Sequence, residues 1–262
     1  MRYIDTHAHL GPWFEAGSTM TPDELIARQQ RAGIERTVVT SSTAIFTDLV
    51  RGNEWTVEQA ETRDHLLVWL VLNPLRLEDS LELLERYQTH PKVVGIKIHP
   101  SLHRYPADIR ATYRLFGRIE PLRFPVLSHG ENESYASPDR LRRLADAFPN
   151  ITLVAAHFGA GQPGQTEVAI DQISECRNGN MVTDMGTARA IRSGIIEQMV
   201  KGIGADKILF GTDMPLYEAM AFPALLAAAN ISQEDRELIA HGNAERLILA
   251  PRGIGSRDAR AV

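Results

Sequence analysis

The stretch that decides the fold is Tyr3-Ile4-Asp5-Thr6-His7-Ala8-His9-Leu10, close to the N-terminus. Side chains alternate along a strand, so His7 and His9 point to one side while Ile4, Thr6 and Ala8 point to the other. The second side suits packing against helices, whereas two imidazoles on the first side can converge on one cation. The stretch therefore predicts a buried strand that carries two candidate metal ligands at its carboxyl end.

Seven further segments are rich in valine, isoleucine and leucine and show little polar alternation, as is typical of strands buried on both faces. They are 36–42, 66–72, 93–99, 124–130, 151–157, 180–186 and 207–213. The first helix is predicted after Thr21, where Thr21 suits the N-cap, Pro22 the first turn and Glu24 a capping box. The other helical patterns are 48–63, 77–89, 108–121, 138–148, 163–177, 189–203, 216–229 and 232–248.

The ends of the predicted strands recur every 26 to 32 residues, which fits one strand, one helix and two loops. Eight such units predict an α/β fold of the (β/α)8 TIM-barrel type, for which about 250 residues is typical. We expect a single domain over residues 1–250 and a flexible C-terminal tail over 251–262, where periodicity ends. The alternative is an open doubly wound sheet, which normally uses fewer strands and a glycine-rich phosphate loop.

Composition narrows the class of protein. With 44% hydrophobic and 23% charged residues, the 262-residue chain is typical of a soluble globular protein. Its net charge of −5 and the lack of a basic stripe disfavour nucleic acid as a partner. No apolar run has the length of a membrane span. The single Cys176 and an N-terminus without an apolar signal segment favour a cytoplasmic location. A homo-oligomer is compatible with this sequence.

Histidine is common here and lysine is scarce, with nine and four residues respectively. Five of the histidines fall at the ends of predicted strands, and Asp213 ends the last one; the five are His7, His9, His99, His129 and His157. A lone histidine on a buried strand is more often a hydrogen-bonded core residue. Because active sites of such barrels lie at the carboxyl ends of the strands, this combination instead predicts a divalent metal site in a pocket.

Lys97 shares one face of its predicted strand with His99. A lysine on a buried strand must be paired, neutralised or modified. It is therefore interpreted as an ion-pair partner of a buried carboxylate such as Asp5, as a cation that holds substrate, or as a modified metal ligand.

Several residues in loops on the same side are candidate substrate contacts. His103 follows the fourth strand, and Trp13 with Phe14 follows the first. Glu131, Asn132 and Glu133 follow the fifth strand and offer polar contacts. Arg189 and Arg192 follow the seventh strand and are candidate partners for a substrate carboxylate.

The order of these motifs resembles the amidohydrolase superfamily, in particular its metal-dependent "amidohydrolase 2" branch. The resemblance rests on Asp5-Thr6-His7-Ala8-His9, His129, His157, Gly211-Thr212-Asp213-Met214-Pro215 and the terminal Gly242-Asn243-Ala244-Glu245-Arg246-Leu247, and it covers residues 3–249. It implies that His7, His9 and Asp213 bind a divalent metal, most often zinc, with His129 as a further ligand. It also implies that His157 either binds a second metal or acts as an acid or base.

Lys97 leaves the number of metal ions open. Lys97-Ile98-His99-Pro100, followed by Ser128-His129-Gly130-Glu131, resembles dihydroorotases, in which a carboxylated lysine bridges two metals. Many members of the "amidohydrolase 2" branch carry a similar segment without an established bridging role. The sequence is thus compatible with one ion or with two. TatD-like nucleases share the first motif, but their usual bridging glutamate is absent here.

The leading hypothesis for function is hydrolysis of an amide, lactone or ester bond in a small molecule by metal-activated water. Asp213 would take the proton from that water, and His157 or His99 would stabilise the oxyanion. The alternative is a metal-dependent decarboxylase in which Lys97, Arg189 and Arg192 hold a substrate carboxylate. A barrel with a purely structural zinc is disfavoured, because such sites are closed and often cysteine-rich.

Overall fold

A computed structural model describes residues 1–13, 18–130, 134–159 and 165–255 of the chain. One curled sheet, mainly parallel, runs through the described residues, in the strand order β2-β1-β3-β4-β5-β6-β7-β8-β9. Its strands are β1 (Tyr3–Trp13), β2 (Ser18–Met20), β3 (Ile34–Ser41), β4 (Leu66–Val71), β5 (Val93–Ile98), β6 (Val126–Ser128), β7 (Leu153–Ala155), β8 (Met181–Asp184) and β9 (Ile208–Leu209). All neighbours are parallel except β2, which pairs antiparallel with β1.

The predicted parallel strands are all present at the expected places. β4 and β5 are buried along their whole length. This agrees with their apolar sequences, because each strand packs against helices on one side and pairs with neighbouring strands within the sheet. The later strands are shorter than predicted: only Ile208–Leu209 of the segment 207–213 pairs as a strand. The remaining residues of that segment leave the sheet and carry Asp213 into the candidate site.

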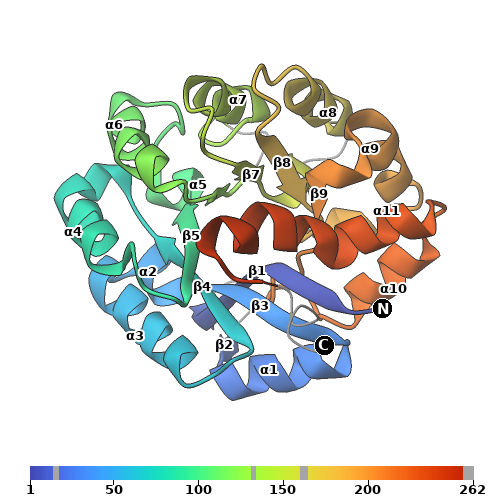
Figure 1. The fold of residues 1–262 in the computed structure, drawn as a ribbon, viewed down its shortest axis with the longest axis horizontal. Helices are drawn as coiled ribbons and strands as arrows, with labels where there is room; N and C mark the ends of the chain where they lie inside the picture. The colour runs from blue at the N-terminus through green and yellow to red at the C-terminus, as the bar shows by residue number, and fades with distance from the viewer. Residues whose placement is uncertain (14–17, 131–133, 160–164, 256–262) are drawn as a thin grey trace.

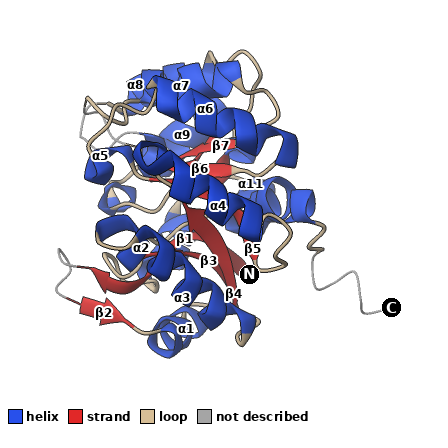
Figure 2. Ribbon diagram, turned by 90° about the vertical axis from the view of Figure 1, so that its left-hand side faces the viewer, coloured by secondary structure: helices blue, strands red, loops and turns tan. Residues whose placement is uncertain are grey.

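Helices cover the outside of the sheet (Figures 1 and 2). They are α1 (Pro22–Arg31), α2 (Ser42–Phe46), α3 (Leu49–Glu61), α4 (Leu77–Tyr87), α5 (Pro100–His103), α6 (Arg110–Ile119), α7 (Pro138–Ala147), α8 (Thr166–Ser174), α9 (Ile195–Ile203), α10 (Ala221–Ala228) and α11 (Gln233–Glu237). The capping box predicted at Thr21 and Glu24 is confirmed. The short elements β2, α2 and α5 were not predicted, because three to five residues show no periodicity. The last predicted helix is α-helical at its start and at Asn243 and Ala244, and it forms wider turns over Leu238–Gly242 and Glu245–Leu249.

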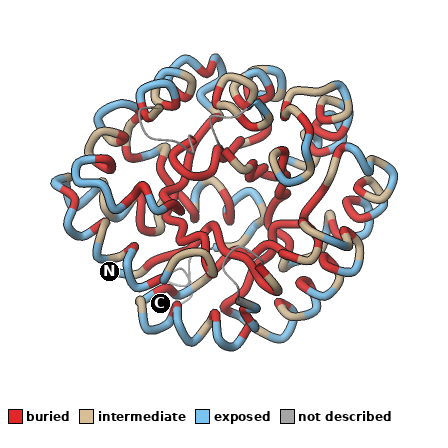
Figure 3. Tube along the Cα trace, turned by 180° about the vertical axis from the view of Figure 1, so that it is seen from behind, coloured by how far each residue is buried: buried red, intermediate tan, exposed pale blue. Residues whose placement is uncertain are grey.

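Burial follows this layered arrangement, with buried backbone along the strands and exposed segments on the outer helices (Figure 3). At the C-terminus, Ala250–Arg252 form a tight turn, and the Arg252 guanidinium lies 4.1 Å from the centre of the Phe124 ring. Residues 256–262 of the predicted tail lie outside the described residues. In the part of the chain that the structure describes, no helix is long and apolar enough to cross a membrane.

The two edges of the parallel sheet approach each other just beyond β9. The amide of Thr6 donates to the carbonyl of Phe210 at 2.9 Å, that of Asp213 to His7 at 2.7 Å and that of His9 to Met214 at 2.7 Å. A single bridge joins Ala8 to Met214, whereas a continuous ladder between β1 and β9 is not found among the described residues. The fold is therefore a mixed α/β fold with a curled parallel sheet, and these contacts place Asp213 beside His7.

Candidate metal centre

A cavity of about 420 Å³ lies at the carboxyl ends of the strands. Most of the predicted site residues line it, from β1, β5, β6 and the loops after β7 and β9. The lining residues are His7, His9, Trp13, Lys97, His99, Ser101, Leu102, His129, His157, Thr187, Asp213, Leu216 and Tyr217. The cavity therefore collects side chains from distant parts of the sequence, as expected where parallel strands end together.

The two histidines of β1 both direct Nε2 toward Asp213. The distances to Asp213 Oδ1 are 3.5 Å from His7 and 3.0 Å from His9. The other nitrogen of each ring has its own partner: His7 Nδ1 lies 2.9 Å from Asp184 Oδ2, and His9 Nδ1 contacts the hydroxyl of Thr40. These second contacts fix both ring orientations, as in most metal-binding histidines.

Asp184 also decides the tautomer of His7. A carboxylate accepts hydrogen bonds, so His7 Nδ1 carries the proton and Nε2 presents a lone pair. Burial lowers the pKa of His7 to about 3, with the charge of Lys97 acting in the same direction. His7 is thus a neutral ring whose Nε2 lone pair faces the cavity, which is the state that a metal ligand requires.

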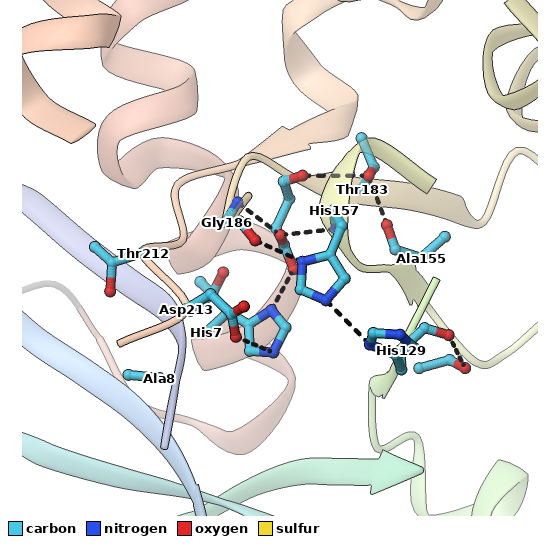
Figure 4. A network of polar contacts seen from close by, with 12 residues as sticks. His7, Ala8, His129, Ala155, His157, Thr183, Gly186, Thr212 and Asp213 are labelled. Carbon is cyan, nitrogen blue, oxygen red and sulfur yellow. Dashed lines mark hydrogen bonds and ion pairs between the residues drawn. The ribbon is translucent and has the colours of Figure 1, made fainter. Parts of the chain in front are cut away.

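His157 sits in a strained turn directly after β7. Its φ of 65° and the φ of 56° at Phe158 are left-handed, which is unusual for residues other than glycine. His157 Nδ1 contacts the carbonyl of Gly186, so it must donate and Nε2 again presents a lone pair. That Nε2 lies 3.1 Å from His129 Nδ1 (Figure 4). Strain of this kind is typical of functional sites.

Asp213 is positioned by a hydrogen-bonded turn at the sheet edge, and its own φ is 57°. The buried Asp5 stabilises this turn: its Oδ1 accepts from the amides of His7 and Thr212, each at 3.0 Å, and its Oδ2 accepts from the Thr212 hydroxyl and Gln29 Nε2, at 2.6 and 2.7 Å. Burial raises the pKa of Asp5 to about 7 against these donors. Asp5 thereby ties the segment that carries His7 to the segment that carries Asp213.

Asp184 is the functional candidate that sequence reasoning missed. Its Oδ2 contacts His7 Nδ1, while its Oδ1 accepts from the amides of His157 and Gly186 at 3.1 and 2.9 Å. Burial opposes ionisation, but the hydrogen bonds from the His7 ring and the His157 amide hold the pKa of Asp184 below its usual value. The sequence signal for Asp184 is a carboxylate at the end of a buried strand, two residues before Gly186.

The donor set fits a divalent metal ion. Ligand atoms of His7, His157 and Asp213 lie within 4.8 Å of one another, and all three residues are buried. Two fixed imidazole lone pairs and a carboxylate oxygen thus converge on one point, an arrangement that is repulsive without a cation between them. Imidazole and carboxylate ligands suit several divalent metals, manganese and zinc among them.

Lys97 is fully buried beside this set. Its Nζ lies 3.1 Å from His7 Nε2, and burial lowers the pKa of the ammonium to about 8 although Asp213 and Asp184 oppose that shift. Among the described residues no carboxylate lies within ion-pair distance of Lys97. The ion pair with Asp5 that the sequence allowed is not formed, because hydrogen bonds from β1, α1 and the turn after β9 occupy both oxygens of Asp5.

The predicted substrate contacts divide into two groups. His99 and Trp13 line the cavity: His99 stacks on His129 with ring centres 4.1 Å apart, and the Trp13 ring lies 4.3 Å from that of His9. His103 and Arg189 are not part of the cavity lining that the structure describes. His103 Nε2 donates to the carbonyl of Ile45, and Arg189 Nη2 donates to the hydroxyl of Thr166, so both are held by neighbouring elements.

Some predicted contacts fall outside the described residues, namely Phe14, Glu131, Asn132 and Glu133. Arg192 is described, as the residue that ends the turn Ala188–Ile191, and it is exposed.

A metal-binding set of histidines and a carboxylate, at the carboxyl ends of a curled parallel sheet, defines a metal-dependent α/β enzyme. The chain belongs to the amidohydrolase family, because the family model described as amidohydrolase matches residues 4–248. The family predicted from the sequence is thereby confirmed. No curated protein matches the chain.

Solved structures of similar fold cover nearly the whole chain. The 2,6-dihydroxybenzoate decarboxylase from Rhizobium has a TM-score of 0.77 at 17% identity, with 94% of this chain and 98% of that chain covered. A dihydroxybenzoic acid decarboxylase from a Polaromonas species, with bound manganese and the inhibitor 2-nitroresorcinol, gives 0.77 at 18% identity, covering 94% and 96%. An uncharacterised TIM-barrel protein from Bordetella bronchiseptica gives 0.78 at 18%, covering 97% and 100%. At these identities the likeness shows the fold.

Proposed function

We propose that this protein is a metal-dependent decarboxylase that acts on a small carboxylate, within a closed (β/α)8 barrel. The sequence favoured hydrolysis and kept decarboxylation as the alternative. One observation carries the change of preference: the buried Lys97 ammonium lines the cavity, touches His7 and has no ion-pair partner among the described residues. A buried cation without a carboxylate is costly, and a substrate carboxylate would remove that cost.

The similar structures support the same preference. Several are decarboxylases, and one of them was solved with 2,6-dihydroxybenzoate bound. A cavity of about 420 Å³ lies in the usual range for small-molecule sites and accommodates one substituted aromatic ring. Leu102, Leu216 and Tyr217 supply apolar or aromatic wall beside the polar groups. We therefore expect a hydroxylated aromatic carboxylate as the substrate.

The reaction is the replacement of a carboxylate by a proton. The bond between the carboxylate carbon and the substrate breaks, its electron pair remains on the substrate carbon, and that carbon takes up one proton as carbon dioxide leaves. A bound divalent ion would supply positive charge that polarises a substrate oxygen. His7, His9 and Asp213 would hold this ion, with His129 or His157 as a further ligand.

The residues of the chain have separate roles in this scheme. Lys97 holds the carboxylate before the bond breaks. Asp213 takes up a proton from solvent and passes it to the substrate carbon, because it lines the cavity and its carboxylate stands where β1 and the turn after β9 meet. His157, fixed by Gly186 and Asp184, lies beside Asp213 and orients the substrate there.

The number of ions follows from the state of Lys97. Asp184 and Asp213 bring two buried negative charges, with Asp5 below them, and Lys97 brings one positive charge. An unmodified Lys97 matches a single divalent ion, whereas a carboxylated Lys97 would add negative charge and match two. We propose a single ion, manganese or zinc, because a Lys97 that holds the substrate carboxylate as a cation cannot also bridge two ions as a carbamate.

The test uses 2,6-dihydroxybenzoate labelled with ¹³C in the carboxylate, together with protein loaded with Mn²⁺ or Zn²⁺. Stoichiometric labelled carbon dioxide and resorcinol are expected. The Lys97→Met variant should bind metal but lose turnover. Release of a ring-opened acid from a lactone or amide panel, without carbon dioxide from any carboxylate, would instead make the protein a hydrolase and refute the proposal.

A further inference from the structure

We infer that His99 is a fixed hydrogen-bond donor to an oxygen atom of the substrate, held in a single tautomer by the backbone of the following helix. The inference rests on the proposed function only in placing the substrate in this cavity. His99 would be a specificity residue, distinct from the histidines whose lone pairs face the metal position.

The tautomer of His99 follows from its place at the start of α5. His99 is the N-cap of this short helix, and its Nδ1 accepts a hydrogen bond from the amide of Leu102 at 3.3 Å. The first amides of a helix lack partners within the helix, so this contact satisfies one of them. An amide can only donate, so Nδ1 must present its lone pair and the neutral ring carries its proton on Nε2.

The position of the ring is fixed as well. The ring stacks on His129 with centres 4.1 Å apart and planes 15° apart, and only 4% of His99 is exposed. Nδ1 and Nε2 lie on opposite sides of an imidazole, so the nitrogen that carries the proton points away from the α5 backbone. His99 lines the cavity, and Nε2 has no hydrogen-bond partner among the described residues. A ligand in the cavity is the remaining candidate for that partner.

A comparison with His7 and His157 shows how specific this assignment is. In both of those rings Nδ1 donates, to Asp184 and to the carbonyl of Gly186, and Nε2 presents a lone pair. In His99 the roles of the two nitrogens are exchanged. The same residue type therefore supplies electron pairs on one side of the cavity and a proton on the other.

The chemistry that His99 recognises is an oxygen with a lone pair, which a substrate can present as a carboxylate or as a ring hydroxyl. A donor fixed in advance discriminates strongly, because a ligand without the matching acceptor leaves the buried N–H unpaired. His99 cannot act as a base in this state, since its only lone pair is used by Leu102. Its expected contribution is to binding and orientation of the substrate.

Two substitutions separate the proposed hydrogen-bond donor at Nε2 from the helix-capping contact at Nδ1. In H99N the amide oxygen reaches the Nδ1 position and retains the cap, but no donor reaches the Nε2 position. In H99Q the longer side chain places an N–H near the Nε2 position and loses the cap. We expect H99N to remain folded and to bind ligand at least about tenfold more weakly. We expect H99Q to bind within about threefold of the unchanged protein but to melt at a lower temperature.

Binding is measured by calorimetry on the metal-loaded protein, with benzoate, resorcinol and 2,6-dihydroxybenzoate as probes. A loss in H99N with benzoate assigns the contact to the carboxylate, and a loss with resorcinol assigns it to a ring hydroxyl; either result supports the inference. Metal affinity, titrated separately, should be the same in all three proteins.

Equal binding of all three probes by H99N and the unchanged protein would overturn the inference. So would an equal loss in H99Q and H99N, or a failure of the unchanged protein to bind any probe. These outcomes are independent of turnover. If carbon dioxide is never released but H99N still weakens binding, the decarboxylase proposal fails and the donor role of His99 stands.

Discussion

Two walls of the cavity use the same residue types in opposite ways. The ligand wall consists of His7, His9, His157 and Asp213, and it directs lone pairs toward one point. The donor wall consists of Lys97 and His99 on and after β5, and it directs protons into the cavity. In His7 and His157 the second nitrogen meets an acceptor, and in His9 it meets the Thr40 hydroxyl, whereas in His99 it meets a backbone amide.

This difference shows that the partner outside the cavity decides what a histidine does inside it. Asp184, Gly186 and Leu102 are not part of the described cavity lining, yet each selects the tautomer of a ring that is. Histidine alone therefore predicts a polar site, and the element behind each ring predicts its role.

Asp213→Asn removes the only carboxylate of the ligand wall that also lines the cavity among the described residues. We expect turnover to fall by roughly 10³-fold or more, which corresponds to about 4 kcal/mol. Metal should largely be retained, because the imidazoles remain in place. Turnover by steady-state kinetics and metal content by elemental analysis check this, and full activity in the variant would exclude the role of Asp213 in proton transfer.

Asp184→Asn tests whether the contact between Asp184 and His7 Nδ1 determines the tautomer of His7. The amide of D184N can accept from His157 and Gly186, but its NH₂ group then meets His7 Nδ1–H, so the His7 proton moves to Nε2 and the metal-facing lone pair is lost. We expect metal affinity to fall by about 10- to 100-fold. Calorimetric titration of Mn²⁺ into metal-free protein measures it.

Asp146→Asn is a matched control for this change, since Asp146 accepts from the Arg177 amide on the far side of the chain from the metal centre. Its metal affinity should equal that of the unchanged protein. Unchanged affinity in D184N would show that Asp184 only stabilises the fold.

The elements of the sheet could be predicted from the sequence because buried strands leave a strong pattern. The eight apolar segments, their spacing and the capping box at Thr21 depend on local periodicity and turn chemistry, and the structure confirms them. The placement of His7, His9, His129 and His157 at strand ends followed from the same spacing. The approach of β1 to the segment after β9 depends on backbone contacts between residues more than 200 positions apart, which no local pattern reveals.

The roles within the site were less predictable, because they depend on contacts between strands. Asp184 looks like any residue at the end of a strand until its carboxylate is seen against His7. His103 and Arg189 lie on the correct side of the sheet, but Ile45 and Thr166 hold them away from the cavity lining. Side-chain direction after a strand ends is set by the loop, and loops of this length carry no periodic signal.

Acidification tests whether the rings of both walls are neutral. Burial lowers the pKa of His7, His9, His99, His103 and His129 below the usual 6.5. Below pH 6.5 the unfolded chain binds protons that the folded protein does not, so stability falls as the pH falls. Each such histidine contributes at most about 1.4 kcal/mol per pH unit.

His103→Gln isolates one of these contributions. His103 lies outside the cavity lining and its Nε2 donates to Ile45, a contact that glutamine can keep. The free energy of unfolding of the metal-free protein is measured with urea at pH 5, 6 and 7. Its slope with pH gives the number of protons taken up on unfolding, and this number should be smaller by up to one in the variant. An identical dependence in the two proteins would mean that His103 is protonated to the same extent when folded and unfolded.

The smallest effect concerns the space behind the ligand wall, where Gly211 separates His7 from Asp184. A Cβ on Gly211 would lie 3.1 Å from the Cβ of His7 and 3.4 Å from that of Asp184. The backbone there is not left-handed, so Gly211→Ala should strain only this contact and shift the His7 ring by a few tenths of an ångström. Since metal affinity depends on ligand position, we expect a loss of metal affinity of up to about tenfold, or about 1.4 kcal/mol, with little change in stability.

Gly117→Ala is the matched control, because its Cβ would meet nothing within 4 Å on the exposed side of α6. It should leave metal affinity unchanged and stabilise the helix by about 1 kcal/mol. Metal titration and urea unfolding of both variants separate the two effects. Equal metal affinity in both variants would mean that the His7 side of the ligand wall tolerates displacement, and that Asp184 sets the tautomer of His7 without setting its position.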